Sequence, residues 1–290
     1  MPSLQAVAQA SRLQGIISQP DRPAGRGQKL RPTPVKTAAA AYGVPVYEPR
    51  SLKAFASEHA GEHYDLFVLA SYGRILPAEL LEVPRIGALN VHPSLLPHYR
   101  GATPIQSALR NGDAQTGVSI IMMDAGMDTG PLILQTTVQI EPQDTYATLH
   151  DRLAKIGAKL ITGAIELATQ DELAPRPQTG EPSVTKPLSK GDLIIDWEWP
   201  GERIVNAIRA YSPQPAARSM IAGVAVKLLQ ARRGPSSEGD CAPGELLASH
   251  GDALVIACGD GTIEIERVIP ANRAAMTGEA FVRWLKAQAK

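Results

Sequence analysis

The 290-residue sequence lacks the features that mark several specialised classes of protein. Its two cysteines, Cys241 and Cys258, are too few for a disulfide scaffold or a four-ligand zinc site, and they fit a reducing compartment. It has no apolar run of the roughly 18–20 residues that cross a bilayer, and Met1–Leu4 shows no basic-then-apolar signal pattern. We therefore expect a cytoplasmic protein without a membrane segment.

An excess of charge of either sign is also absent. Lys plus Arg and Asp plus Glu each number 29, so no overall field draws the chain toward nucleic acid or an anionic membrane. Any affinity for a polyanion must come from a local cluster of cations. Hydrophobic residues make up 44% of the chain, which supplies a buried core and excludes a mainly disordered protein.

The first half of the chain alternates between short apolar runs and helical patterns. The runs Leu66–Ala70, Ala88–His92 and Val118–Met123 have the composition of buried strands. Residues Thr145–Ala168 carry apolar side chains at helical spacing. The alternation predicts an α/β fold over residues 1–172, with a doubly wound, mostly parallel, Rossmann-like sheet.

The second half has a different composition. Residues 173–190 are rich in Pro, Gln, Gly, Ser and Thr, which predicts a linker. Residues 191–290 hold a helical pattern, Gly201–Ala210, followed by short alternating segments such as Gly244–Ser249 between turn signals. This pattern predicts a small β-barrel, for which an oligonucleotide-binding type is one candidate.

Asn90 and His92 stand in the most informative stretch, Gly87–Pro97. If Ala88–His92 is a strand, its period of two places both side chains on one face. They lie at its carboxyl end, where open α/β sheets bind ligands. Either residue alone is more often structural than catalytic, but the pair at a strand end favours a site.

A glycine-rich segment, Met123–Gly130, follows another predicted strand. Its simplest interpretation is a turn with solvated carboxylates. Asp128-Thr129-Gly130 is also typical of aspartic proteases, but that chemistry needs two such carboxylates and the chain has one such triplet. A carboxylate beside His92 would instead hold the imidazole and raise its pKa.

A cluster of cations lies in the Gly- and Pro-rich segment Gln19–Pro32. Between Asp21 and Lys36 there are five basic residues and one acidic residue. A Walker phosphate loop is excluded because no Gly-Lys-Ser/Thr closes the segment. It is either a solvated loop or a contact for polynucleotide phosphates, which Arg side chains suit.

Several of these motifs occur together in one known family: Asn90–Pro97, Arg100–Gly101 and Asp124–Gly130, with Gln19–Arg31, Thr103–Gln106 and Arg209–Pro215. The first three resemble the folate-dependent formyltransferases. The others narrow the resemblance to members whose acceptor is a charged initiator tRNA. The resemblance covers nearly the whole chain.

The resemblance implies an enzyme that transfers the formyl group of 10-formyltetrahydrofolate to the amino group of methionyl initiator tRNA, for translation initiation, without a metal. It implies that Asn90 and a protonated His92 stabilise the formyl oxygen, and that Asp128 pairs with His92 and helps to remove the amine proton. It further implies two sets of binding residues. Those for folate are Ser71, Tyr72, Gly73, Ile75, Leu76, Pro77, Ser94, Leu95, Leu96, Pro97, Asp124 and Gly126. Those for tRNA are Arg22, Arg26, Lys29, Arg31 and Lys36.

The resemblance also makes residues 191–290 a tRNA-contacting domain. From Lys190 to Lys290 there are 12 basic and 12 acidic residues, so any contact needs cations gathered on one face. Candidates for that face are Arg203, Arg209, Arg218, Lys227, Arg232 and Arg233. We expect the protein to be a monomer.

The chain opens at Met1-Pro2-Ser3-Leu4, which resembles the beginning of the family's first helix. Family members have a strand and a Gly-Thr-Pro-containing loop before that helix. We therefore expect Met1 to be an internal methionine of a longer product. Without that central strand, neighbouring strands of a doubly wound sheet would be left unpaired.

Two other functions stay open. Asn90, His92 and Asp128 would equally serve a formyltransferase for a small amine, such as glycinamide ribonucleotide or an amino sugar, but the basic loop and the C-terminal domain argue against a small acceptor. A truncated, inactive RNA-binding protein is the other alternative, and folate binding would distinguish it.

Overall fold

A computed structural model of the chain describes residues 1–24, 29–235, 241–247 and 253–288. The chain divides into two compact units. The first contains residues 1–102, 116–138 and 151–185, and the second contains residues 103–115, 139–150 and 186–290. The second unit therefore includes two segments that precede the predicted linker.

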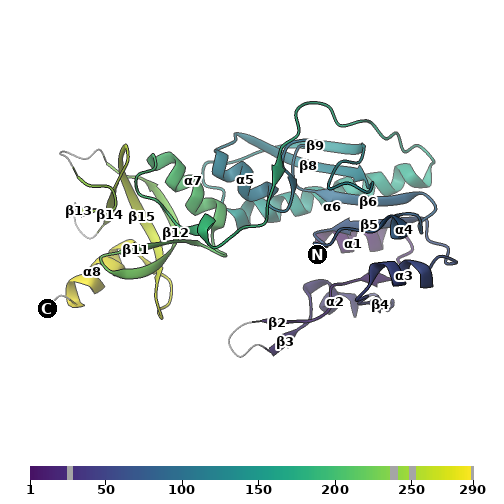
Figure 1. Cartoon of the computed structure of the whole chain (residues 1–290), viewed down its shortest axis with the longest axis horizontal. Coiled ribbons are helices and arrows are strands. Elements are labelled where there is room, and N and C mark those ends of the chain that lie inside the picture. The colour runs from purple at the N-terminus through teal and green to yellow at the C-terminus, as the bar shows by residue number, and fades with distance from the viewer. Residues whose placement is uncertain (25–28, 236–240, 248–252, 289–290) are drawn as a thin grey trace. The chain divides into compact units, whose positions relative to one another are not determined.

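The first unit contains a four-stranded sheet with the order β5 (Leu66–Ala70), β6 (Gly87–His92), β8 (Gln115–Met122) and β9 (Leu132–Gln139) (Figure 1). Strands β5 and β6 are parallel, whereas β6 and β8 are antiparallel. A separate sheet pairs β1 (Ile16–Ile17) with β4 (Val46–Tyr47) in parallel. The remaining elements that begin in this unit are α1 (Pro2–Ala10), β2 (Arg22–Ala24), β3 (Lys29–Arg31), α2 (Pro34–Ala39), α3 (Leu52–Glu58), α4 (Ala78–Leu81), β7 (Arg100–Gly101) and β10 (Val184–Thr185).

The predicted α/β class is confirmed, but the parallel sheet differs in two respects. It consists of two separate sheets, and β8 runs against β6 because His92 pairs with Ser119 and Leu89 with Met122. The chain thus enters β8 beside the end at which it leaves β6. A parallel return would need a helix that crosses the sheet, whereas α5 (Pro104–Asn111) packs against α7 (Gly201–Tyr211).

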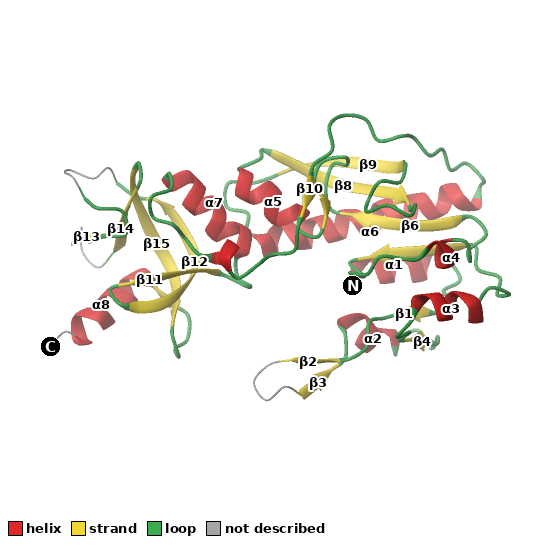
Figure 2. Ribbon diagram, in the orientation of Figure 1, coloured by secondary structure: helices red, strands yellow, loops and turns green. Residues whose placement is uncertain are grey.

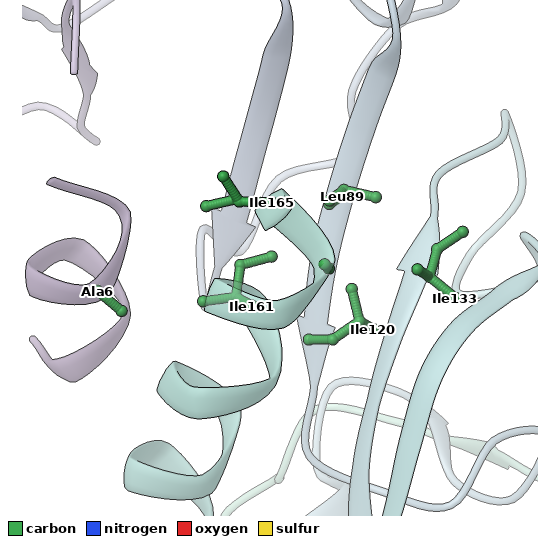
Figure 3. Packing of buried hydrophobic residues seen from close by; sticks show 7 residues of the cluster. Ala6, Leu89, Ile120, Ile133, Ile161 and Ile165 are labelled. Atoms are coloured by element: carbon green, nitrogen blue, oxygen red, sulfur yellow. The ribbon is translucent and has the colours of Figure 1, made fainter. Parts of the chain in front are cut away.

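The core of the first unit lies between its sheet and helix α6 (Tyr146–Thr169), whose first residues belong to the second unit. Figure 3 shows Ile161 and Ile165 of α6 beside the strands that carry Leu89, Ile120 and Ile133. The two isoleucines are four positions apart, so helical spacing puts both on one face of α6. Each such side chain stabilises the fold by about 1.5–3 kcal/mol through burial, so this packing fixes the position of β6.

The second unit contains an antiparallel sheet with the order β11 (Ala217–Ile221), β12 (Val224–Arg233), β15 (Gly261–Pro270), β14 (Leu254–Cys258) and β13 (Leu246–Leu247). Strand β16 (Met276–Thr277) pairs with β15. Helix α7 packs against β12 and β15, and α8 (Gly278–Gln288) against β14 and β15 (Figure 2). The predicted barrel is a curled sheet, since among the described residues β11 and β13 do not pair. Part of the predicted strand Gly244–Ser249 lies outside the described residues.

Candidate active site

The structure brings together Asn90, His92 and Asp128. Asn90 Nδ2 donates a hydrogen bond to Asp128 Oδ1 at 3.2 Å, and His92 Nδ1 lies 3.5 Å from Asp128 Oδ2. Asn90 and His92 reach the same carboxylate because alternate residues of β6 face the same side of the sheet. An amide, an imidazole and a carboxylate therefore form one cluster.

His92 is held at both ring nitrogens. Its Nε2 lies 3.0 Å from the carbonyl oxygen of Tyr99, and a carbonyl only accepts, so Nε2 carries a proton. The ring is 3% exposed, and this burial lowers the pKa of His92, although Asp128 and the Tyr99 carbonyl act in the opposite direction. Asp128 thus raises the pKa of His92 as expected, but burial has the larger effect. Neutral His92 has a bare Nδ1 that faces Asp128.

Asp128 adopts an unusual backbone conformation that its neighbours hold. Its φ is +54°, in the left-handed region that non-glycine residues rarely adopt. The main-chain N–H of Gly101 donates to Asp128 Oδ2 at 2.8 Å. Gly101 has a φ of +103°, and a Cβ there would collide with the carbonyl oxygen of Thr185. Only glycine fits this approach, which places the Gly101 N–H at the carboxylate.

Sequence reasoning missed three groups at this site. They are the Tyr99 carbonyl, the Gly101 N–H and the Gln178 side chain, which donates to the carbonyl oxygens of Asp128 and Gly130. Two are main-chain atoms, which no side-chain pattern reports. Gln178 stands in the predicted linker, where composition alone suggests no contact.

The first predicted folate segment, Ser71–Pro77, follows β5. Ser71 and Gly73 have positive φ values of 54° and 72°. The Tyr72 ring and Leu76 pack on a small core with Leu80. The Tyr72 hydroxyl is buried and has no hydrogen-bond partner in suitable geometry among the described residues. Burial raises the pKa of Tyr72, although the nearby Arg74 guanidinium lowers it. In this segment Ile75 is 75% exposed, and Pro77 immediately precedes α4.

The second predicted folate segment, Ser94–Pro97, lies mostly in the interior. Ser94, Leu96 and Pro97 are buried, and Leu95 is half-buried. Ser119 Oγ donates to the Ser94 carbonyl at 2.7 Å and accepts from the Leu96 N–H at 3.2 Å. These hydrogen bonds connect the segment to Ser119 of β8. Contact between this segment and folate remains a prediction.

The third predicted folate segment contains a closed turn. Asp124 Oδ1 accepts from the Gly126 N–H at 3.0 Å and from Thr129 Oγ1 at 2.6 Å. A Cβ at Gly126 would collide with Thr129 Oγ1, so a larger residue here would displace the side chain that donates to Asp124. Met127 in this turn is 46% exposed. Asp124 thus shapes the loop that carries Asp128.

The predicted tRNA residues lie on or beside a hairpin of β2 and β3. Arg22 lies directly opposite Arg31 in its register. Arg22 Nη2 donates to Gln19 Oε1 at 2.6 Å, whereas Lys29 and Arg31 are exposed and make no contact of this kind with described residues. Arg26 lies outside the described residues.

Lys36 has a different environment from the one expected. Its Nζ lies 2.9 Å from Asp21 Oδ1 and 2.8 Å from Glu48 Oε2, and these partners, Glu48 first, raise its pKa. The ammonium group is therefore already paired with two carboxylates. The structure favours a role for Lys36 in holding the base of the hairpin.

The six predicted cations of the second unit differ in whether they have a partner among the described residues. Arg232 pairs with Glu264, Arg233 pairs with Asp260, and the Arg203 guanidinium lies 4.0 Å above the Trp199 ring. Arg209, whose pKa burial lowers, donates to Asn206 Oδ1 at 2.9 Å. Arg218 and Lys227 lie directly opposite each other on β11 and β12, without an ion pair to any described residue. Contact of the six predicted cations with tRNA stays a prediction, and Arg218 and Lys227 are the two without such a partner among the described residues.

The described part of the chain contains neither a metal-ligating cluster nor a candidate membrane span. No group of three or more His, Cys, Asp or Glu side chains there is arranged to hold a metal ion. No helix among these residues has both the length and the apolar composition that a membrane span requires.

Two family models and individual relatives match this chain over most of its length. A formyl transferase family model matches residues 3–165, and a model of the formyl transferase C-terminal domain matches residues 187–286. The methionyl-tRNA formyltransferase of Thiobacillus denitrificans is 44% identical over 270 residues, which are 92% of this chain and 87% of that protein.

Solved structures are similar at lower identity. HypX from Aquifex aeolicus in complex with tetrahydrofolic acid has a TM-score of 0.65 at 19% identity, over 94% of this chain and 47% of that one. Methionyl-tRNA formyltransferase from Clostridium thermocellum has a TM-score of 0.53 at 18% identity, over 77% of this chain and 94% of that one. These two similarities support the fold alone.

Proposed function

The chain belongs to the formyl transferase family, and from that premise we propose that it transfers the formyl group of 10-formyltetrahydrofolate to the amino group of methionine on initiator tRNA. The single observation that carries the proposal is the Asp128 carboxylate, which lies within 3.5 Å of both the Asn90 amide and the His92 imidazole. This cluster supplies the two things that the reaction needs, a donor for the formyl oxygen and an acceptor for the amine proton.

Asn90 is the donor. When the amine attacks the formyl carbon, negative charge develops on the formyl oxygen, and a fixed hydrogen-bond donor stabilises it. Asn90 Nδ2 has two N–H groups and uses one on Asp128. The second is available for the formyl oxygen, while the first keeps the amide in position.

Asp128 and His92 together accept the proton that the amine loses. Because Nε2 donates to Tyr99, neutral His92 presents a bare Nδ1 to the carboxylate, and two lone pairs then face each other. One proton between Asp128 Oδ2 and His92 Nδ1 removes this repulsion. The pair therefore takes up the amine proton, directly or through a water molecule, and can pass it to the nitrogen of the folate when the bond between that nitrogen and the formyl carbon breaks. We propose this role for His92 in place of the donor role that the resemblance implies for its protonated form.

The residues present fit a folate. Tyr72 supplies a buried hydroxyl without a partner, and the N–H groups of Gly73, Arg74 and Ile75 donate to no other described residue. Such groups suit the carbonyl and ring nitrogens of a pterin. Exposed Ile75 and Met127 offer apolar contact for its aromatic portion. The bound 10-formyltetrahydrofolate would supply the formyl group.

Two cationic pairs support contact with tRNA. Like charges directly opposite on antiparallel strands destabilise a sheet, and both Arg22–Arg31 and Arg218–Lys227 have this arrangement. A phosphate between the members of each pair would remove the repulsion. We propose that these pairs, with Lys29, bind the phosphate backbone.

A formyl-transfer assay tests the function. The purified chain should formylate methionine on initiator tRNA with 10-formyltetrahydrofolate, and it should not formylate glycinamide ribonucleotide. Transfer to the small amine without transfer to the charged tRNA would contradict the proposed acceptor. Folate binding without any transfer would contradict the enzyme itself.

Two further properties belong to this proposal. Translation initiation takes place in the cytoplasm, which is the compartment we propose. The cluster of Asn90, His92 and Asp128 is formed within one chain, so we also propose a monomer. Light scattering of the purified chain should give the mass of a single chain.

A further inference from the structure

Gln178, in the segment expected to be a linker, contacts the loop that carries Asp128. It is half-buried although residues 174–177 and 179–182 are exposed. Its Nε2 donates to the carbonyl oxygens of Asp128 and Gly130, both at 2.8 Å. Its Oε1 accepts from Arg100 Nε at 3.1 Å and from Arg100 Nη2 at 2.7 Å. One side chain thus connects Arg100 to two points of the loop.

These hydrogen bonds determine the orientation of the Gln178 amide. A guanidinium only donates and a carbonyl only accepts, so Oε1 must face Arg100 and the NH₂ group must face the loop. Both N–H groups and both lone pairs of Oε1 are then used. The amide has no capacity left for a substrate, and its contacts are all with the chain itself.

The conformation that Gln178 holds is one that needs support. Asp128 has a φ of +54°, and such residues persist only where the surrounding structure fixes them. Gln178 donates to the carbonyl oxygen of Asp128 and to that of Gly130, so it holds the main chain on both sides of Thr129. The direction of the Asp128 carboxylate therefore depends on the Gln178 amide.

The same segment holds the groups that bind His92 and the Asp128 carboxylate. Ser183 Oγ accepts from the Tyr99 N–H at 2.8 Å, and Tyr99 supplies the carbonyl for His92. Strand β10 pairs with β7, which contains Gly101, the donor to Asp128. Both members of the proton-accepting pair are thus oriented by residues 178–185.

We propose that Gln178, itself held by Arg100, is a positioning residue that sets the distance between the Asp128 carboxylate and the His92 imidazole. The proposal rests on the proposed function, because it assigns Gln178 a role in proton removal by that pair. Gln178 does not touch the substrate in this role. A change at position 178 should therefore lower kcat and leave KM for tRNA nearly unchanged.

Two variants and one matched control test this role. Gln178→Glu keeps oxygens that accept from Arg100 but loses both donors to the loop, and Gln178→Ala loses all four hydrogen bonds. Each should lower kcat by about 10–100-fold, as small displacements of catalytic groups do. KM for tRNA should change by less than about threefold, since no phosphate contact is lost. Thr179→Ala, at an exposed neighbouring position, should match the wild type.

A titration of His92 by NMR gives a readout that does not need turnover. Asp128 raises the pKa of His92, so a displaced Asp128 should let that pKa fall further in Gln178→Ala. The His92 signal is identified by its loss in His92→Asn. If the wild type transfers no formyl group, the proposed function fails, but this titration still tests Gln178. Equal kcat and equal His92 titration in Gln178→Ala, Gln178→Glu and Thr179→Ala would overturn the proposal.

The contribution of Arg100 is tested by a double variant. If Arg100 acts through Gln178, Arg100→Ala with Gln178→Ala should lower kcat no more than Gln178→Ala alone. Losses that multiply would show that Arg100 acts independently, and the part of the proposal that assigns it to Gln178 would be wrong.

Discussion

At the scale of the residue, the His92 environment determines how activity depends on pH. The Asp128–His92 pair accepts a proton in our mechanism, so it must be unprotonated at the start of the reaction. Burial lowers the pKa of His92. We therefore expect kcat to stay constant at and above neutral pH and to fall only as the pH falls through this lowered pKa, below the ordinary histidine range. A pH–rate profile on charged tRNA checks this, and a fall centred above the ordinary range would contradict it.

Asn90 permits a second test at this scale. Asn90→Ala removes the donor to the developing charge, so kcat should fall by about 10²–10³-fold. The side chain is half-buried and, among the residues that the structure describes, makes one hydrogen bond, to Asp128. The melting temperature should therefore change little. Near-full turnover in this variant would remove Asn90 from the mechanism.

Residue-scale prediction from the sequence depends on spacing. Asn90 and His92 could be paired because a strand repeats every two residues, and their contacts with one carboxylate agree with that. Gln178 could not be predicted, since it reaches Asp128 across 50 positions and its composition-biased surroundings suggest only a linker. The lowered pKa of His92 also depends on burial, which spacing does not report.

At the scale of the element, the β2–β3 hairpin should act as a phosphate contact. Arg31→Ala removes one exposed cation, so tRNA affinity should fall and the slope of log affinity against log salt should decrease by about one. Lys53→Ala is the control for the loss of one cation elsewhere in the first unit, since exposed Lys53 pairs with Glu79 and lies outside the hairpin. It should leave the slope unchanged. Binding isotherms at several salt concentrations measure both, and equal slopes for wild type and Arg31→Ala would contradict the contact.

Prediction of elements succeeds where their periodicity is local. The apolar spacing predicts a helix at Thr145–Ala168, and α6 spans Tyr146–Thr169. The direction of β8 could not be predicted in this way, because it depends on where α5 packs, against α7 and not across the sheet. Strand direction is a property of long-range packing, which no short pattern contains.

At the scale of the whole molecule, the division of the strands into two sheets determines which strands have an edge without a partner strand. Strand β5 pairs with β6 alone among the described residues, and β1 pairs with β4 alone. The residues Leu66–Leu69 are half-buried although they are apolar, whereas β8 is buried along most of its length. An edge strand lacks hydrogen bonds for its outward amides. The alternate amides of β5 that face away from β6 should therefore exchange hydrogen at rates set by local opening.

The central strand β6 supplies the comparison for this prediction. It pairs with β5 on one side and β8 on the other, so its amides should exchange only through larger openings. Hydrogen exchange measured by NMR separates the two classes residue by residue. Uniform protection across β5 and β6 would mean that the outer edge of β5 is covered in solution, and this prediction would be wrong. Rapid exchange at β5 with slow exchange at β6 would place Asn90 and His92 on a strand that is more stable than the edge strand, because the site is built on a strand that is paired on both sides.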